Sequence, residues 1–409
     1  MKDYREQACR IIGRERLNEL EGKNIEIIIG IPSYNSSHSI AFVAEQASRG
    51  LKKYFPNASS IIINTDGNSS DGTKTAFLGA ETEVEKLFSA HKGPRGKGAQ
   101  LKDVLTIAAA INAKACLFID SDLQSINEEW VYAMLSPIYE GFDMVTPHYS
   151  RYKYDGTITN NICFPVVYGL FCRNLRQPIG GDFAFSRRLL LYWLKDPMWD
   201  SDISRYGIDI YMSTLALLGG FKVTQTYLGA KIHDAKDPSG LKPMFKQVVG
   251  TLFKVLYAYK KKWMNRKFPY DVKITGVGYF AEPMKFDVNI RKMKTTFMRG
   301  FAANKKHLQR IISRKNFDKL EFMAKEKNVF IDNRMWAEIV YDCVLAFPKE
   351  GKNRITDVLF PLYQGRNYTF ALETVGYEDK HAEERIMLQA KAFHLKRKYL
   401  INAVNSVNI

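Results

Sequence analysis

Two aspartates separated by one residue, Asp120 and Asp122, follow the apolar run ACLFI and could do chemistry with a cation. Alternate residues of a strand point to the same side, so this spacing can aim two carboxylates at one point. Adjacent carboxylates repel unless a cation lies between them, and hard oxygen ligands suit Mg²⁺ or Mn²⁺. The pair predicts a divalent metal site. Two aspartates that only cap the following turn are the simpler alternative.

A second candidate is the loop GPRGKGAQ at residues 93–100, which precedes a helical pattern. Glycines let a backbone approach an anion closely, and a helix N-terminus attracts negative charge. Arg95 or Lys97 could therefore contact a diphosphate. The loop does not match the GxxxxGK[ST] phosphate-binding pattern, and a basic surface loop remains the alternative.

Three apolar, β-branched runs are expected to be the strands that position these residues: 25–32, 60–65 and 115–120. Continuous runs of this kind are typical of strands buried on both faces of a parallel sheet. Helical periodicity between them predicts an α/β, doubly wound, Rossmann-like sheet with helices on both faces.

Ligands of such sheets bind beyond the carboxyl ends of the strands. Three polar loops follow the expected strands and should converge there: Pro32 to Tyr34, Asp66 to Gly67, and Asp120 to Asp122. These loops are the expected binding edge of the sheet.

The second half of the chain has a different pattern. Strand signals fade beyond about residue 250, and helical stretches rich in Lys, Phe, Leu and Met follow. A chain of 409 residues exceeds what one core usually supports. We expect an α/β domain with the candidate binding residues over residues 1–250 and a mainly helical region over residues 251–409.

The charge of the chain is strongly positive, with a formal net value of +17. Residues 251–330 hold 20 Lys and Arg against 6 Asp and Glu. A solvated helical face explains this most simply, while anionic substrates or a membrane surface are sharper interpretations. No nucleic-acid motif accompanies the charge, so nucleic acid is not an expected partner. With 46% hydrophobic and 25% charged residues, the composition excludes a disordered or collagen-like chain.

The cysteines and the N-terminus predict a cytoplasmic protein. Five widely spaced cysteines without a CxxC pair support neither a disulfide framework nor a cysteine-based zinc site. The first 20 residues lack the apolar core of a signal peptide, and no segment approaches the roughly 20 apolar residues that span a bilayer. Membrane contact is therefore not expected.

Several motifs in one order resemble the GT-A fold glycosyltransferases that use nucleotide sugars. They are IPSYN, TDGNSSDGT, GKG and FIDSD, followed by RYKYDGTIT (151–159), QPIGGDFAFSRR (177–188), YGIDIYMST (206–214) and KIHDAKDPSG (231–240). The later motifs are similar to the retaining enzymes that glycosylate glycerate, the mannosylglycerate and glucosylglycerate (glucosyl-3-phosphoglycerate) synthases. The segment RNYTFALETVGYED (366–379) resembles a C-terminal part of the mannosylglycerate synthases.

The resemblance implies a donor and metal site. Asp122 and His233 would be the metal ligands, and Asp120 would contact the ribose or the metal shell. Lys97 would pair with the donor diphosphate. Two further aspartates, Asp182 and Asp209, would act at the donor sugar. The resemblance also puts Pro32, Tyr34 and Asp66 among the donor-binding residues.

An acceptor loop is implied as well, formed by Arg151, Asp155, Gly156 and Thr159. Its arginine and hydroxyl would hold the carboxylate of glycerate, for which the guanidinium fork is suited. Two departures concern this site. A family tyrosine is replaced by Lys236, which could favour a phosphorylated acceptor, and the family GGE is Gly180-Gly181-Asp182 here.

The function implied by the resemblance is a metal-dependent retaining hexosyl transfer. Glucose or mannose would pass from a nucleotide-diphosphate sugar, expected to be GDP-linked, to D-glycerate or a similar hydroxy acid, giving a compatible solute. The metal and Lys97 would neutralise the departing diphosphate, whose oxygen would help to deprotonate the acceptor. The alternatives are an inverting transferase acting on a lipid or polysaccharide at a membrane, and a nucleotide-binding protein without turnover. A homodimer built on the apolar C-terminal helices is also expected.

Overall fold

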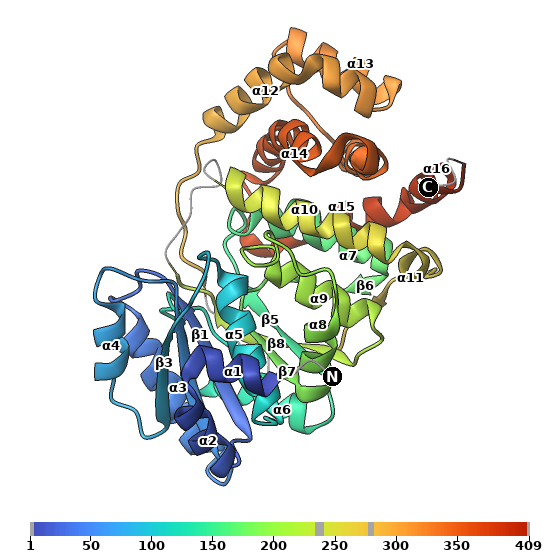
Figure 1. Cartoon of the computed structure of the whole chain (residues 1–409). Coiled ribbons are helices and arrows are strands. Elements are labelled where there is room, and N and C mark those ends of the chain that lie inside the picture. Colours follow the sequence, from blue (N-terminus) through green and yellow to red (C-terminus); the bar gives the residue numbers. More distant parts are fainter. Residues whose placement is uncertain (1–3, 234–240, 277–281, 407–409) are drawn as a thin grey trace. The chain divides into compact units, whose positions relative to one another are not determined.

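A computed structural model describes residues 4–233, 241–276 and 282–406 of the chain (Figure 1). The chain divides into two compact units that interleave along the sequence. Unit 1 comprises residues 1–150, 179–235 and 272–283, and unit 2 comprises residues 151–178, 236–271 and 284–409. The chain thus leaves unit 1 after residue 150 and returns to it at residue 179. The domain boundary expected near residue 250 stays a prediction.

Unit 1 contains an eight-stranded sheet in the order β10-β8-β5-β7-β4-β1-β2-β3. The strands are β1 (Ile27–Ser33), β2 (Ser60–Asp66), β3 (Glu85–Ala90), β4 (Ala115–Phe118), β5 (Met144–Ser150), β7 (Phe183–Ser186), β8 (Val223–Ala230) and β10 (Ile274–Thr275). All neighbouring pairs are parallel except those of β7, which runs antiparallel to both β4 and β5. The carboxyl ends of β1, β2 and β4 therefore meet at one edge.

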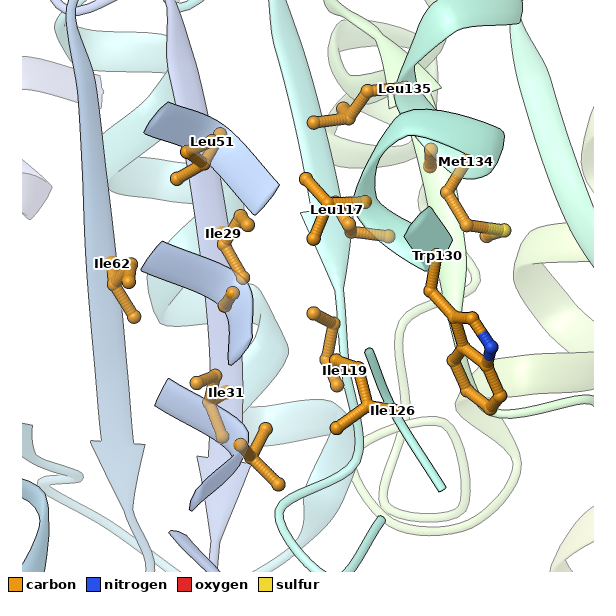
Figure 2. Packing of buried hydrophobic residues seen from close by; sticks show 14 of the residues in the cluster. Ile29, Ile31, Leu51, Ile62, Leu117, Ile119, Ile126, Trp130, Met134 and Leu135 are labelled. Carbon is orange, nitrogen blue, oxygen red and sulfur yellow. The ribbon is translucent and has the colours of Figure 1, made fainter. Parts of the chain in front are cut away.

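The helices of unit 1 are α1 (Tyr4–Ile12), α2 (Arg14–Gly22), α3 (Ile40–Tyr54), α4 (Thr73–Gly79), α5 (Lys97–Ala110), α6 (Glu128–Tyr139), α8 (Arg187–Lys195) and α9 (Ile208–Leu218). Figure 2 shows how α3 and α6 cover one face of the sheet. The packing forms a cluster of buried hydrophobic residues, which includes Ile29 and Ile31 of β1 and Leu117 of β4. Gly30 faces the other way, since a Cβ there would lie 3.0 Å from Val104 of α5. Successive residues of β1 thus pack on opposite helical layers, which is why the run is apolar throughout.

Unit 2 is mainly helical. Its elements are the π-helical turn η1 (Thr159–Cys163), α7 (Phe164–Phe171), α10 (Lys242–Ala258), α11 (Lys260–Met264), α12 (Ile290–Ile311), α13 (Arg314–Lys325), α14 (Asn333–Thr374), α15 (Asp379–Leu395), α16 (Arg397–Ser406) and the short strands β6 (Arg173–Asn174) and β9 (Tyr270–Asp271). Gly351, with φ 76° and ψ 162°, interrupts α14. Asp332 caps its first turn by accepting from the backbone N–H groups of Arg334 and Met335.

The predicted fold class is confirmed: an α/β sheet with helices on both faces, and a helical C-terminal region. The strands β3, β5 and β7 are not among those expected from the sequence. β3 is an edge strand with mostly half-buried residues, and β5 contains Pro147 and His148, so neither forms a long apolar run. Within the described ranges, no helix has both the length and the apolar character needed to cross a membrane.

Candidate active site

The carboxyl ends of β1 and β2 are joined by side-chain hydrogen bonds. The Ser33 hydroxyl donates to Asp66 Oδ1 at 2.8 Å, and the backbone N–H of Ser69 donates to Asp66 Oδ2 at 2.7 Å. The buried carboxylate of Asp66 thus holds the turn that follows β2. Tyr34, just beyond the end of β1, is exposed, and the guanidinium of Arg95 lies 3.7 Å from its ring centroid. Pro32 is buried at the end of β1.

Five charged side chains gather beside these strand ends, and we call them the lysine–aspartate cluster: Lys97, Asp120, Asp182, Asp209 and Lys231. Lys97 Nζ lies 2.7 Å from Asp120 Oδ1, and Lys231 Nζ lies 3.0 Å from Asp120 Oδ2. Each oxygen of Asp120 therefore faces its own ammonium group. Lys97 also reaches Asp209 Oδ1, in the first turn of α9, at 3.3 Å.

Asp182 links the cluster to two neighbouring strands. Its Oδ1 accepts the backbone N–H of Asp120 at 2.7 Å, and its Oδ2 lies 2.9 Å from Lys231 Nζ. The hydroxyl of Tyr149, on β5, donates to the same Oδ2. Only 4% of the Lys231 side chain and 3% of the Asp182 side chain are exposed, so water contributes little to their solvation. The ion pair must then be kept together, because a buried charge without a partner is strongly destabilising.

The charges within the cluster set its protonation. Burial alone would raise the pKa of Asp120, but the charges of Lys231 and Lys97 hold that pKa below its usual range. Burial would lower the pKa of Lys97, but Asp120 and Asp209 hold it above its usual range. Burial raises the pKa of Asp209, and the charge of Asp120 adds to that rise. Asp120 is thus an anion and Lys97 a cation, while the proton affinity of Asp209 is increased.

Gly181 makes the close approach within the cluster possible. Its φ is +95°, and a Cβ at this position would lie 2.4 Å from Asp120 Oδ2 and 3.1 Å from Lys231 Nζ. Gly180 contributes its carbonyl oxygen, which accepts from Lys231 at 3.0 Å. The Gly-Gly-Asp turn is therefore shaped around the ammonium group of Lys231.

We predict that Gly181→Ala lowers both stability and turnover. Forcing a side chain into this backbone region is expected to cost roughly 1–3 kcal/mol, before the clash with Asp120 is counted. Thermal unfolding and initial rates would measure the two effects. Gly79→Ala is the matched control, because a Cβ there would meet nothing within 4 Å. If Gly181→Ala behaved like this control, the tight turn would have no role.

The glycines around Lys97 lie against protein backbone, and the expected approach of this loop to an anion stays a prediction. A Cβ on Gly96 would lie 2.2 Å from the carbonyl oxygen of Ser204, and one on Gly98 would lie 1.8 Å from that of Ile203. The backbone N–H of Ala99 donates to Ser204 O at 2.8 Å. The first turn of α5 is thus packed on the 203–205 turn, which satisfies its N–H groups. These glycines admit protein backbone, and this contact fixes where the side chain of Lys97 begins.

The predicted metal ligands, Asp122 and His233, come from two segments that are bonded together. The backbone N–H of Gln124 donates to the carbonyl of Ile232 at 2.8 Å, and Ile232 N–H donates to Ser125 Oγ at 3.0 Å. β4 ends at Phe118, so the alternation of strand residues does not govern Asp120 and Asp122 as the sequence suggested. In the structure, the loop after β4 is held instead by Ser121, whose carbonyl accepts from Ser39 at 2.8 Å.

A carboxylate and an imidazole, as in Asp122 and His233, would suit a divalent cation that shares its coordination with a substrate. Among the residues that the structure describes, no group of three or more acidic, histidine or cysteine side chains could hold a metal ion by itself. Mg²⁺ in nucleotide sites usually keeps several waters and takes one or two carboxylates together with substrate phosphates. Asp122 and His233 would be its protein ligands here, and their assignment stays a prediction.

The predicted acceptor residues come together within unit 2. Arg151 donates to Asp155 Oδ2 at 2.9 Å, and the backbone N–H of Gly156 donates to Asp155 Oδ1 at 2.7 Å. A Cβ on Gly156, whose φ is +64°, would lie 3.4 Å from the Arg151 guanidinium and 3.8 Å from Thr159 Oγ1. These four residues therefore surround one short turn. Lys236 lies outside the described residues.

Two residues of the site were not expected from the sequence: Lys231 of the cluster, and Tyr149, which donates to Asp182. Lys231 stands at the end of the strand-like run before His233, where a lone lysine after apolar residues is the signal that could have identified it. Tyr149 has no such signal, since one aromatic residue on a strand is ordinary. Its role depends on β7 bringing Asp182 beside β5.

The chain has a mixed α/β sheet with a single reversed strand and an acidic loop after β4, which agrees with the α/β fold class that the sequence predicted. No family model matches the chain. The chain is similar in sequence to glucosyl-3-phosphoglycerate synthases, which confirms the predicted resemblance. It is 25% identical to the Mycolicibacterium smegmatis protein over 249 residues, covering 56% of this chain and 77% of that protein. It is 26% identical to the Mycobacterium tuberculosis protein over 261 residues, covering 58% and 76%.

Solved structures of the M. tuberculosis synthase also match the chain. One, in complex with Mg²⁺ and UDP, has 24% identity and a TM-score of 0.46, covering 58% of this chain and 82% of that one. Another, in complex with Mn²⁺, UDP-glucose and phosphoglyceric acid, has 23% identity, the same TM-score and the same coverage.

Proposed function

We propose that this chain is a metal-dependent glycosyltransferase that moves a hexose from a nucleoside-diphosphate sugar to 3-phosphoglycerate or glycerate. The observation that carries the proposal is the sequence similarity to glucosyl-3-phosphoglycerate synthases over more than half of the chain. The lysine–aspartate cluster at the binding edge supports it, because that edge is where α/β sheets bind nucleotides.

The chemistry of such a transfer suits the charges of the cluster. As the bond to the sugar breaks, negative charge develops on the departing diphosphate, and preorganised cations stabilise it. Lys97, held charged beside Asp120 and Asp209, is our candidate for this role. A divalent ion held by Asp122 and His233 would supply further charge neutralisation when bound. Asp182 and Asp209 are our candidates for contact with the sugar, and Pro32, Tyr34 and Asp66 for the rest of the donor.

A donor-by-acceptor screen tests the proposal. The purified chain is incubated with UDP- or GDP-linked glucose or mannose, with glycerate or 3-phosphoglycerate, and with Mg²⁺ or Mn²⁺. A soluble glycosylated acid is expected, and NMR of its anomeric proton would test the proposed retention of configuration. The comparison of GDP-linked with UDP-linked donors tests the expected GDP linkage. Product only on added lipid would favour the membrane-bound alternative, and donor binding without product would favour a protein that lacks turnover.

Arg151→Ala is predicted to raise the acceptor KM far more than the donor KM. Losing charge-assisted hydrogen bonds to a carboxylate typically costs about 1.5–3 kcal/mol, which is roughly 10- to 150-fold in binding. Thr159→Val should have a milder effect, because a hydroxyl offers one neutral donor. Initial rates with each substrate varied in turn would separate the two constants. An unchanged acceptor KM, or an effect that added salt reproduces in the unaltered protein, would contradict this role.

We also propose a homodimer based on the helical C-terminal region, and cytoplasmic action on a soluble acceptor. A molar mass measured by light scattering at micromolar concentration tests the first point. A monomer would refute it.

A further inference from the structure

The C-terminal segment 366–379, which the sequence singled out, forms the end of α14 and the turn into α15. Lys153, in the middle of the acceptor loop, is attached to this turn. Its ammonium group donates to the carbonyl oxygens of Thr374 at 2.8 Å and Tyr377 at 2.6 Å. Its backbone N–H donates to Asp379 Oδ1 at 2.9 Å. One residue of the loop is therefore fixed at both its backbone and its side chain.

The environment of Lys153 explains why this attachment is strong. The residue is 8% exposed, so its charge has little contact with water. The last carbonyl groups of a helix have no partner within the helix and carry its partial negative charge. A lysine that donates to these carbonyl groups gives them the hydrogen-bond partners they lack, and it gives its own ammonium group acceptors. The carbonyl of Val375, at 3.5 Å, belongs to the same group of acceptors.

Two residues that follow Lys153 in the loop are attached to α14. The Tyr154 hydroxyl donates to the carbonyl of Ala371 at 3.3 Å, and Thr157 Oγ1 lies 2.6 Å from the Tyr363 hydroxyl. All of these contacts join the loop to positions more than 200 residues later in the chain. Arg151, Asp155 and Gly156 lie between or beside these attachment points.

A buried polar network continues the attachment into η1. The fully buried Arg366 donates to Gln389 Oε1 at 2.6 Å, and Gln389 Nε2 donates to the carbonyl of Asn160 at 2.9 Å. The Asn161 amide donates to Asn367 Oδ1 at 2.7 Å. The first residue of the C-terminal motif thus supports the turn that follows Thr159.

We propose that Lys153 is a positioning residue for the acceptor: it holds the loop of Arg151 and Thr159 in its binding shape by anchoring it to the α14–α15 turn. This inference rests on the proposed function. The ammonium group of Lys153 already donates to backbone carbonyls at the end of α14. Lys153 would therefore affect acceptor binding through Arg151 and its neighbours. Misplacement of a binding group by about 1 Å can cost roughly 100-fold in rate.

The test compares four variants with the unaltered chain. Lys153→Met keeps a long side chain but removes the ammonium group, and Asp379→Ala removes the acceptor of the loop N–H. Asp379→Asn is the conservative variant, since an amide oxygen can accept the same hydrogen bond. Lys380→Ala is the matched control, because it removes an exposed lysine from the first turn of α15. Hydrogen exchange of residues 151–159 and both KM values are measured for each.

We expect Lys153→Met and Asp379→Ala to raise the acceptor KM at least tenfold, to leave the donor KM within twofold and to speed exchange in the loop. Asp379→Asn and Lys380→Ala should resemble the unaltered chain. Faster exchange with an unchanged acceptor KM, or equal rises in both KM values, would overturn the positioning role. If Lys153→Met does not fold, Asp379→Ala with its asparagine rescue decides alone. Absence of any glycosylated acid from the unaltered chain would instead overturn the proposed function, and the kinetic role with it.

Discussion

Replacing Lys231 by methionine is expected to destabilise the protein and abolish turnover. The ammonium group of Lys231 faces Asp120 Oδ2 at 3.0 Å and Asp182 Oδ2 at 2.9 Å, and 4% of its side chain is exposed. Removing one partner of a buried ion pair typically costs about 3–5 kcal/mol, because the other charge stays buried without compensation. Chemical denaturation would measure the loss of stability, and initial rates the loss of activity.

Two comparisons make this prediction specific. Lys114→Met breaks a pair of the same length, 3.0 Å to Glu26, but 65% of the Lys114 side chain is exposed, so the change should be below about 1 kcal/mol. The double variant Lys231→Met with Asp182→Asn removes both charges and should recover part of the stability without recovering turnover. If Lys231→Met were as stable and as active as Lys114→Met, the central role of Lys231 would be wrong.

Asp122→Ala and His233→Ala are each expected to reduce turnover by about 100- to 1,000-fold or more, which corresponds to roughly 3–4 kcal/mol of transition-state stabilisation. Both side chains stand on segments joined through Gln124, Ser125 and Ile232. A cation between them would therefore lose affinity when either is removed. When turnover is measured at increasing Mn²⁺ concentration, both variants should need more Mn²⁺ than the unaltered chain to reach half of their maximal rate.

Chelation provides the independent control for the metal. Excess EDTA should stop the unaltered chain, and added Mn²⁺ or Mg²⁺ should restore it. Thermal unfolding of both variants without metal should remain a single cooperative transition, which would show that the loss of turnover does not come from a lost fold. Full activity in EDTA would rule out the metal assignment, whatever the variants show.

The sequence predicted those parts of the site whose residues lie close together along the chain. Asp120 and Asp122 follow a buried strand, as the apolar run before them predicted. The three apolar runs identified β1, β2 and β4 because strands buried on both faces have no polar positions. Local pattern was sufficient in each case.

The remaining contacts depend on tertiary structure and could not be predicted in this way. Lys231 meets Asp120 across 111 residues of sequence, and Lys153 meets Tyr377 across 224. The glycines of the GKG motif illustrate a different difficulty. Their small size was correctly seen as important, but the group that they accommodate is the backbone at residues 203–205, which no local pattern identifies.

The reversed direction of β7 has a consequence for how this chain could diversify. β5 ends at Ser150 and β7 begins at Phe183, and because the two strands are antiparallel, these two ends lie at the same edge of the sheet. The excursion between them, which carries the acceptor loop, therefore starts and finishes at one place. Such a segment can change in length between its attachments to α14 and α15 without a shift of register in any strand of the sheet. The proposed acceptor loop could thus change in evolution, or by loop grafting, while the strand pairing of unit 1 stays intact.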